Sequence, residues 1–374
     1  MSEIATVARR RARTVSQVGR RARIVPLVLA IALLVAPFYV DAFWLQIGLF
    51  GLAAAVAALG LGLLLGQAGQ LSLGHSFFVA VGAYGYTVLA AEDRTIGVSH
   101  QFGLGLPPLL AALAAVLLAG AAGLLFSPIA ARLRGIYLGI ASLGLVFLGQ
   151  HVLFNAETLT GGFNGRTVPE FTLFGFSFGD LRGEALYVLG VPFGREEKLW
   201  YLAVAVTAAA YLFFRNVAKS RPGRALRAVR DNEIAAEIMG VGVARYKAYA
   251  FLVSSMYAGL GGVLLALAFH RIVPETFGVA LAVEYLAMVV IGGLGSAGGA
   301  IAGALFVSAL PTVLERYAGV LPGLVAGSSE GVTPGVAAKF AYGAAIILIL
   351  LFEPGGAAAV ATRVRTVLSP RTSQ

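Results

Sequence analysis

Long apolar runs constrain this chain more than any other feature. A helix that crosses a membrane needs roughly 20 mostly apolar residues. Ten stretches approach that description: 24–40, 42–66, 73–91, 105–131, 135–155, 198–218, 248–270, 281–296, 299–316 and 336–352. Only 12% of the 374 residues are charged, about half the share of a soluble domain. The sequence therefore predicts an all-α, polytopic transmembrane bundle of about ten helices, with 281–316 either two crossings or one broken, re-entrant segment.

The order of the charges predicts the orientation of these helices. Residues 1–23 carry seven arginines against one glutamate, and positive loops stay on the cytoplasmic side. Ten crossings then place 219–247 and the tail 354–374 inside, and the acidic loop 156–197 outside. We expect a basic cytoplasmic segment, a membrane domain over 24–353, and both termini inside. The net charge of +10 then reflects orientation in a lipid bilayer, not binding to nucleic acid.

The polar loop 219–247 contains the signals of a short helix. Asp231 and Asn232 are suitable N-caps, Glu233 suits the positive start of a helix, and Gly240 suits its end. These signals predict a helix of about seven residues. Its small, partly apolar surface fits a groove of another protein, or the helix is a surface connector with no partner. The candidate residues are Asp231, Glu233, Ile234, Ala235, Ala236, Glu237, Ile238 and Gly240.

Polar residues inside or beside apolar runs are the candidates for a translocation path. Lipid cannot satisfy such groups, so they face the bundle interior or water. The candidates are Gln70, Ser72, His75, Thr160, Gly161, Gly162, Asn164 and Glu284. The glycines at 161 and 162 also fit a tight turn, and Glu284 also fits an outer interface. His75 has no second ligand at helical spacing, so we expect a packed histidine and no metal site.

Glycines between the last apolar runs predict close helix packing. Gly295, Gly299 and Gly303 repeat every fourth residue, and Gly292 and Gly293 precede them. Small residues at this spacing allow two helix backbones to approach closely. The contact lies either between two subunits or within one bundle.

Several catalytic motifs are absent from the sequence. It contains no Gly-x-x-x-x-Gly-Lys-Ser/Thr phosphate loop, no Gly-x-Ser-x-Gly, no His-Glu-x-x-His and no cysteine. We therefore expect a protein that is not an enzyme and that binds no nucleotide through such a loop.

Four stretches resemble one family of membrane proteins. They are GQAGQLSLGHSFFVAVGAY from Gly66, LRGIYLGIASLG with LTGGFNG from Leu133, GRALRAVRDNEIAAEIMGVGVARYKAYAF from Gly223, and PETFGVALAVEYLAMVVIGGLGSAGGAIAGAL from Pro274. In this order and spacing they are similar to the branched-chain (hydrophobic) amino acid permeases of ATP-driven ABC importers. The family's Glu-Ala-Ala-x-x-x-Gly core corresponds to Ala235, Ala236 and Gly240, but Ile234 stands at its first position and the glutamate comes one residue earlier.

The resemblance implies a subunit that moves its substrate by alternating access across the plasma membrane. It implies two ATPase subunits docked on loop 219–247, a second related permease (commonly a heterodimer) and an external solute-binding protein. ATP and Mg would bind the partner subunits, and this chain would bind no cofactor. Two alternatives stay open: a permease for urea or short amides, and a secondary transporter driven by an ion gradient, for which Glu284 is the candidate ion site.

Overall fold

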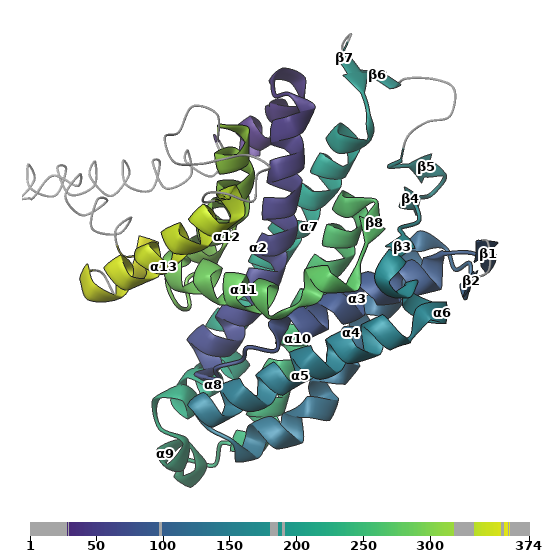
Figure 1. Ribbon diagram of the computed structural model, residues 1–374. Coiled ribbons are helices and arrows are strands. Elements are labelled where there is room, and N and C mark those ends of the chain that lie inside the picture. Colours follow the sequence, from purple (N-terminus) through teal and green to yellow (C-terminus); the bar gives the residue numbers. More distant parts are fainter. Residues whose placement is uncertain are drawn as a thin grey trace, which may run out of the picture.

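The computed structural model describes residues 28, 30–96, 99–179, 186–188, 191–317, 333–352, 355–357 and 359. The predicted basic segment 1–23 and most of the tail 354–374 lie outside these residues, as do Asp180 and Glu184 of the acidic loop. The described part is a helical bundle (Figure 1). This agrees with the predicted fold class at the level of a polytopic helical protein.

Six described helices are long and apolar enough to cross a membrane. They are α2 (Ala42–Ala68), α4 (Pro108–Arg132), α5 (Ile136–Asn155), α7 (Arg195–Lys219), α10 (Val243–Phe269) and α12 (Ala297–Arg316). At 1.5 Å per residue the 27 residues of α2 and of α10 span about 40 Å, more than the roughly 30 Å of a bilayer core.

Shorter apolar helices complete the bundle. They are Ala30–Tyr39, α3 (His75–Ala90), α11 (Val279–Gly292) and α13 (Pro334–Phe352). The predicted pair at 281–316 is thus a 14-residue helix, a turn at Gly293–Ser296 and a 20-residue helix. At roughly 21 Å, α11 is shorter than a bilayer core is thick.

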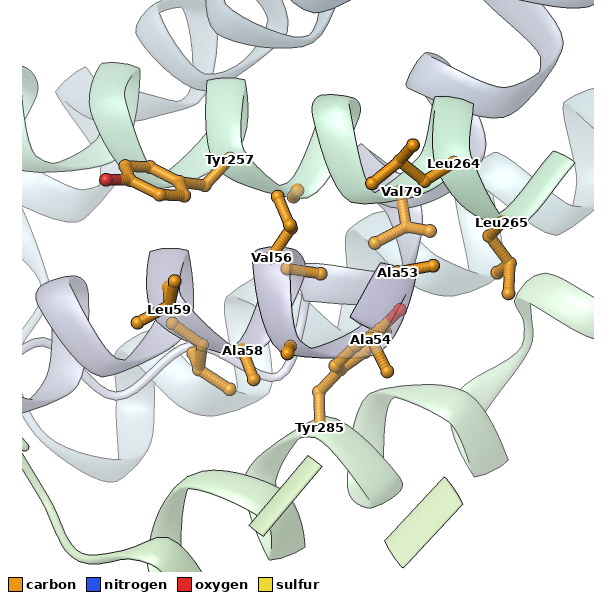
Figure 2. Packing of buried hydrophobic residues seen from close by; sticks show 14 of the residues in the cluster. Ala53, Ala54, Val56, Ala58, Leu59, Val79, Tyr257, Leu264, Leu265 and Tyr285 are labelled. Carbon is orange, nitrogen blue, oxygen red and sulfur yellow. The ribbon is translucent and has the colours of Figure 1, made fainter. Parts of the chain in front are cut away.

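Helices α2 and α10 form the centre of the bundle. In their most apolar stretches 89% and 83% of the residues are buried, against 28–33% in the other four long helices. Figure 2 shows Val56 and Leu59 of α2 beside Tyr257 of α10, with Tyr285 of α11 on the opposite side of α2. Glycines also allow α3 to pack closely on α10, because a Cβ at Gly82 of α3 would lie 2.1 Å from the carbonyl oxygen of Gly259 in α10. The outer helices are left with large apolar side chains on their outward faces, as a lipid environment requires.

Short helices and strand pairs lie at the two ends of the long helices. At one end, which we call the α9 end, lie α8 (Arg221–Asp231) and α9 (Glu233–Ile238). At the other, the ribbon end, lie α6 (Glu157–Thr160), the 3₁₀ helices Gly162–Asn164 and Pro274–Phe277, and eight short strands. These strands are β1 (Arg94–Ile96), β2 (Ser99–Gln101), β3 (Arg166–Thr167), β4 (Thr172–Leu173), β5 (Phe176–Ser177), β6 (Leu186–Val188), β7 (Val191–Phe193) and β8 (Arg271–Ile272). In Figure 1, α9 is at the lower left and β1, β2 and α6 are at the right.

The strands form antiparallel pairs that the all-α prediction did not contain. The pairs are β1–β2, β4–β5, β6–β7 and β3–β8. Three of them join neighbouring segments, but β3 pairs Arg166 with Ile272, far along the chain. This last pair ties the loop after α5 to the end of α10. The strands are two or three residues long, so they leave the helical character of the fold unchanged.

Candidate functional site

Helix α9 has the local structure that the sequence predicts, with six residues where about seven were expected. The Asn232 side chain accepts a hydrogen bond from the Ala235 amide at 3.0 Å. Gly240 follows the helix with φ of 82°, a conformation that suits glycine. Asp231 is instead the last residue of α8, where its carboxylate pairs with Arg230 at 2.9 Å. Of the two predicted caps, Asn232 is therefore the one that acts on α9.

Helix α9 has one side buried against the bundle and one exposed, apolar side. Ala236 is fully buried against the bundle. Ile234, Ile238 and the following Met239 are 64%, 82% and 71% exposed. Ala235 and Glu237 also face outward. A helix that, with the residue after it, exposes three large apolar side chains at a polar end of the molecule presents a surface for a partner protein.

Glu233 connects α9 to α10 and to the turn between α4 and α5. One carboxylate oxygen lies 2.7 Å from Nζ of Lys247, which is 1% exposed in the first turns of α10. The other lies 2.8 Å from the Arg134 guanidinium, in the turn between α4 and α5. Because Lys247 is buried, loss of this partner would leave an unpaired charge inside the bundle. A displacement of α9 is therefore opposed by contacts to α10 and to the α4–α5 turn together.

Helix α8 fixes the neighbouring end of α2. Arg230 donates to the Gly66 carbonyl oxygen at 2.7 Å, and Arg227 donates to the Gln67 side chain at 2.9 Å. The apolar side chains of Leu226 and Val229 face the bundle. The basic residues of this segment are thus partly used to hold α8 against α2.

The first group of predicted path residues lies just after α2. Gln70, Ser72 and His75 are 4%, 1% and 1% exposed. His75 is packed as predicted: its Nε2 lies 2.7 Å from the Ala57 carbonyl oxygen and its ring is edge-on to Tyr285. The Ser72 hydroxyl accepts from the Gly74 amide. The side chain of Gln70 has no hydrogen-bond partner among the described residues.

The second group lies at the ribbon end, separated from the first by the length of α3. The Thr160 hydroxyl donates to carbonyl oxygens of Leu153 and Ala156 and accepts from the Gly162 amide. Gly161 and Gly162 have φ of 76° and 53°. These contacts make a tight turn, the alternative that the sequence left open. Asn164 is exposed, and its carbonyl oxygen accepts from Arg271. The structure therefore does not bring the predicted path residues into one cluster.

Glu284 belongs to a different helix, whose Tyr285 contacts His75 of the first group. It is half-buried in α11, next to the buried Tyr285. Lys339 of α13 is the positive charge that acts on it. The carboxylate is thus inside an apolar helix, not at the end of one.

The glycine repeat packs two helices of this one chain. A Cβ at Gly299 would lie 2.1 Å from the Gly292 carbonyl oxygen, and one at Gly303 would lie 2.0 Å from that of Met288. Gly293 and Gly295 form the turn, with φ of 107° and 78°. Of the two readings of the sequence, packing of α11 on α12 within one bundle is the one that the structure supports.

Sequence reasoning missed α8 and the partners of Glu233. The sequence contains the signals for α8. Ser220 is an N-cap and Pro222 stands in the first turn. Leu226 and Val229, three residues apart, share the buried face. Arg134 and Lys247 were counted only as loop charges. Nothing in the sequence connects them to Glu233, because all three lie on different elements.

Comparison with known proteins identifies the family. Residues 43–352 match the family described as "Branched-chain amino acid transport system / permease component". The chain belongs to this permease family. Its relatives include the "High-affinity branched-chain amino acid transport system permease protein LivM" of Escherichia coli, 34% identical over 72% of this chain and 62% of that protein.

Two further comparisons show the range of similarity. The "Probable branched-chain amino acid transport permease protein LivM" of Methanocaldococcus jannaschii is 24% identical over 71% of this chain and 72% of that protein. A solved structure, "PsaBC from Streptococcus pneumoniae in complex with Fab", is 17% identical with a TM-score of 0.41, covering 87% of this chain and 97% of that chain. That structural similarity is too low to support an argument. The chain matches less than two thirds of the length of its Escherichia coli relative.

Proposed function

We propose that this chain is the membrane-spanning subunit of an ATP-driven importer for branched-chain or other hydrophobic amino acids in the plasma membrane. The observation that carries the proposal is α9, a short helix that exposes Ile234 and Ile238 while Glu233 ties it to α10 and to the α4–α5 turn. A surface of this kind suits a groove on an ATPase subunit. The substrate class is supported by the family and by the named relatives.

The charges support a cytoplasmic position for the α9 end. Arg132, Arg134 and the basic residues of α8 gather there, and positive charge marks the cytoplasmic side. The ribbon end is then external and faces a solute-binding protein. Both termini are cytoplasmic in this arrangement.

The proposed mechanism is alternating access in a complex of two ATPases, this permease and a second related permease. ATP and Mg bind the ATPase subunits, and closure of the ATPase pair moves the docked α9. The ion pairs of Glu233 pass that movement to α10 and the α4–α5 turn. Because α10 is central and closely packed, its displacement opens the bundle on one side as it closes the other. Our candidates for residues that line the translocation path remain Gln70, Ser72 and His75, between the end of α2 and the start of α3.

The test is ATP-dependent uptake of labelled leucine into liposomes. The chain is reconstituted with the ATPases, the partner permease and the binding protein of its own importer. Ile238→Glu places a charge on the exposed apolar side of α9, and we expect it to abolish uptake while the chain still inserts and folds. Ile238→Leu keeps that side apolar and is expected to transport normally.

Each other outcome would change the proposal in a different way. Uptake that needs no ATPase and follows an ion gradient would refute the importer and favour Glu284 as an ion site. ATP-dependent uptake of urea or an amide without leucine uptake would keep the architecture and replace the substrate. Normal leucine uptake by Ile238→Glu would refute the docking role of α9.

A further inference from the structure

The ribbon end contains a cavity that none of the features above uses. Its volume is about 540 Å³, within the range of roughly 300–1,000 Å³ that is usual for small-molecule sites. It lies between the end of α3, the strands β1, β2 and β3, the start of α7 and the end of α10. These elements come from five parts of the chain, and the long-range β3–β8 pair holds two of them together.

Two arginines lie deep in the wall of this cavity. Arg166 is 2% exposed and Arg195 is 8% exposed. The Arg195 guanidinium contacts the His270 ring and donates to the Leu267 carbonyl oxygen. Arg166 donates to the Leu159 carbonyl oxygen at 2.9 Å, which occupies one of the five N–H donors of a guanidinium. Among the residues that the structure describes, no carboxylate forms an ion pair with Arg166. A buried cation without a direct ion-pair partner is costly, so the site favours an anionic group from a ligand.

The electrostatic surroundings of Arg166 agree with that deficit. Burial lowers the pKa of the Arg166 guanidinium, and the more distant charge of Asp93 opposes the shift. The guanidinium stays protonated at neutral pH, because an arginine pKa begins far above 7. Its forked donors match the two oxygens of a carboxylate.

Two carboxylates and an apolar wall line part of the remaining cavity, together with Arg94, Gln101 and His270. Glu92 and Glu170 are exposed at its rim, within reach of an ammonium group entering from solvent. Ala90, Ala91 and Val168 provide an apolar wall. A ligand with a carboxylate, an ammonium group and an aliphatic side chain can use all three kinds of surface. A simple anion cannot use the glutamates, and a neutral amide such as urea can pair with none of the charges.

We propose that this cavity is an external binding site for a zwitterionic aliphatic α-amino acid, with the carboxylate at Arg166 and the ammonium group at Glu92 and Glu170. The site deepens the proposed function and rests on it. It receives the amino acid at the external end, before the solute enters the bundle. It also adds a selection step against uncharged solutes to that made by the binding protein.

Protection of a single cysteine tests the site even when binding is weak. The chain has no cysteine of its own, so Thr167→Cys places one label site on this chain at an exposed position in the cavity wall. The complex of this chain with its partner permease and ATPases is placed in nanodiscs without the binding protein, and its labelling by a maleimide is followed. Leucine at ten times its dissociation constant should slow labelling about tenfold, in proportion to 1 + [L]/Kd. Thr172→Cys, exposed on β4 outside the cavity, is the control and should show no protection.

Analogues and charge variants test each half of the ligand. Leucinol lacks the carboxylate and 4-methylpentanoate lacks the ammonium group, so each should protect only at concentrations about tenfold or more higher, and urea not at all. Glu92→Gln in the Thr167→Cys chain should raise the leucine concentration needed by about tenfold. Glu275→Gln, which removes an exposed carboxylate outside the cavity, should leave it unchanged. Arg166→Gln should abolish protection; since Arg166 also holds Leu159, Arg166→Lys and the elution profile of each variant serve as checks on folding.

The outcomes separate this inference from the proposed function. A complex that imports leucine with ATP and binding protein, but shows no protection at Thr167→Cys, would overturn the cavity site and leave the importer standing. Protection that Glu92→Gln leaves unchanged would also overturn it. So would a result in which the Arg166 and Glu92 variants reduce the stimulation of ATP hydrolysis by the binding protein but leave protection by leucine unchanged. Absence of ATP-dependent uptake for every solute would instead overturn the proposed function.

Discussion

The two ends of this molecule use their charges in opposite ways. At the α9 end the charged side chains have direct partners. Glu233 lies 2.7 Å from Lys247 and 2.8 Å from Arg134, and Arg230 donates a hydrogen bond to the Gly66 carbonyl oxygen. At the ribbon end, Arg166 is almost fully buried and forms no ion pair with any described carboxylate. The α9 end pairs its buried charge directly, whereas at the ribbon end the buried Arg166 has no ion pair and lies beside a cavity with Glu92 and Glu170 at its rim.

This difference separates transmission of movement from recognition of a ligand. An ion pair that joins three elements makes them move together, because separating a buried charge from its partner is costly. A charge that lacks a partner gains most when a ligand supplies one. The same long helices, above all α10, connect the two ends. The comparison therefore predicts rigid coupling at the α9 end and ligand-dependent behaviour at the ribbon end.

Glycines with positive φ give the largest expected contrast between the ends. Gly161 has φ of 76°, and an added Cβ would lie 2.1 Å from the Gly165 carbonyl oxygen. Gly161→Ala should lower the free energy of unfolding by about 3 kcal/mol, from backbone strain and overpacking combined. Gly240 has φ of 82° with nothing within 4 Å, so Gly240→Ala should cost only about 1 kcal/mol. Thermal unfolding of the purified chain in detergent measures both, and equal costs would show that the turn at 161 adjusts freely.

Removal of the Glu233 charge has an expected effect of equal size. Glu233→Gln leaves Lys247 buried without its ion-pair partner. We expect the free energy of unfolding to fall by about 3 kcal/mol. This is the low end for a broken buried pair, because Glu233 itself is partly exposed. Glu237→Gln, on the exposed side of the same helix, should stay within about 0.5 kcal/mol. In the reconstituted complex, Glu233→Gln should also lower leucine uptake more than ATP hydrolysis.

A second substitution distinguishes loss of the pair from loss of the glutamate itself. Lys247→Met removes the buried cation, so adding it to Glu233→Gln should recover part of the lost stability. It should not recover the ratio of uptake to ATP hydrolysis, because the connection from α9 to α10 is still missing. Recovery of both would refute a coupling role for the pair.

The sequence predicted elements whose causes are local. The limits of α5 at Ile136 and Asn155 follow the apolar run, and α9 follows its cap at Asn232. It did not predict what depends on contacts between distant segments. The pairing of Arg166 with Ile272 and the contact of Glu233 with Arg134 need the bundle to be assembled first.

The candidate site was predictable in one half only. The residues of α9 could be predicted from caps and spacing. The sequence does not show which of them face outward, since Ala235 and Ala236 are the same residue type but Ala235 is exposed and Ala236 is buried. The path residues were chosen mainly for polarity, and the structure places them at two ends of α3, with Glu284 on α11. Polarity shows that a group needs a partner, not where the partner lies. The cavity at the ribbon end is formed by five chain segments, so no single stretch of sequence could reveal it.

The two alanines of α9 provide a smaller test of how that helix is seated. Ala236 is fully buried, so Ala236→Leu should overpack the contact and cost about 2 kcal/mol. Ala235→Leu adds the same atoms to the exposed side and should change stability little. Unfolding midpoints of the two variants measure the difference. A neutral Ala236→Leu would mean that α9 is loosely held, and rigid coupling at this end would be wrong.

Two tyrosines of α3 give the smallest expected effects and test the ribbon end. The Tyr86 hydroxyl donates to the Pro169 carbonyl oxygen at 3.1 Å, and Pro169 lines the cavity. Tyr86→Phe should cost about 1 kcal/mol, since one hydrogen bond is lost. The buried hydroxyl of Tyr84 has no partner among the described residues, so Tyr84→Phe should be neutral or slightly stabilising in unfolding experiments. If Tyr84→Phe destabilised the chain as much as Tyr86→Phe, a water or ligand atom would have to satisfy the Tyr84 hydroxyl, and this end would hold more bound polar partners than the contrast with the α9 end assumes.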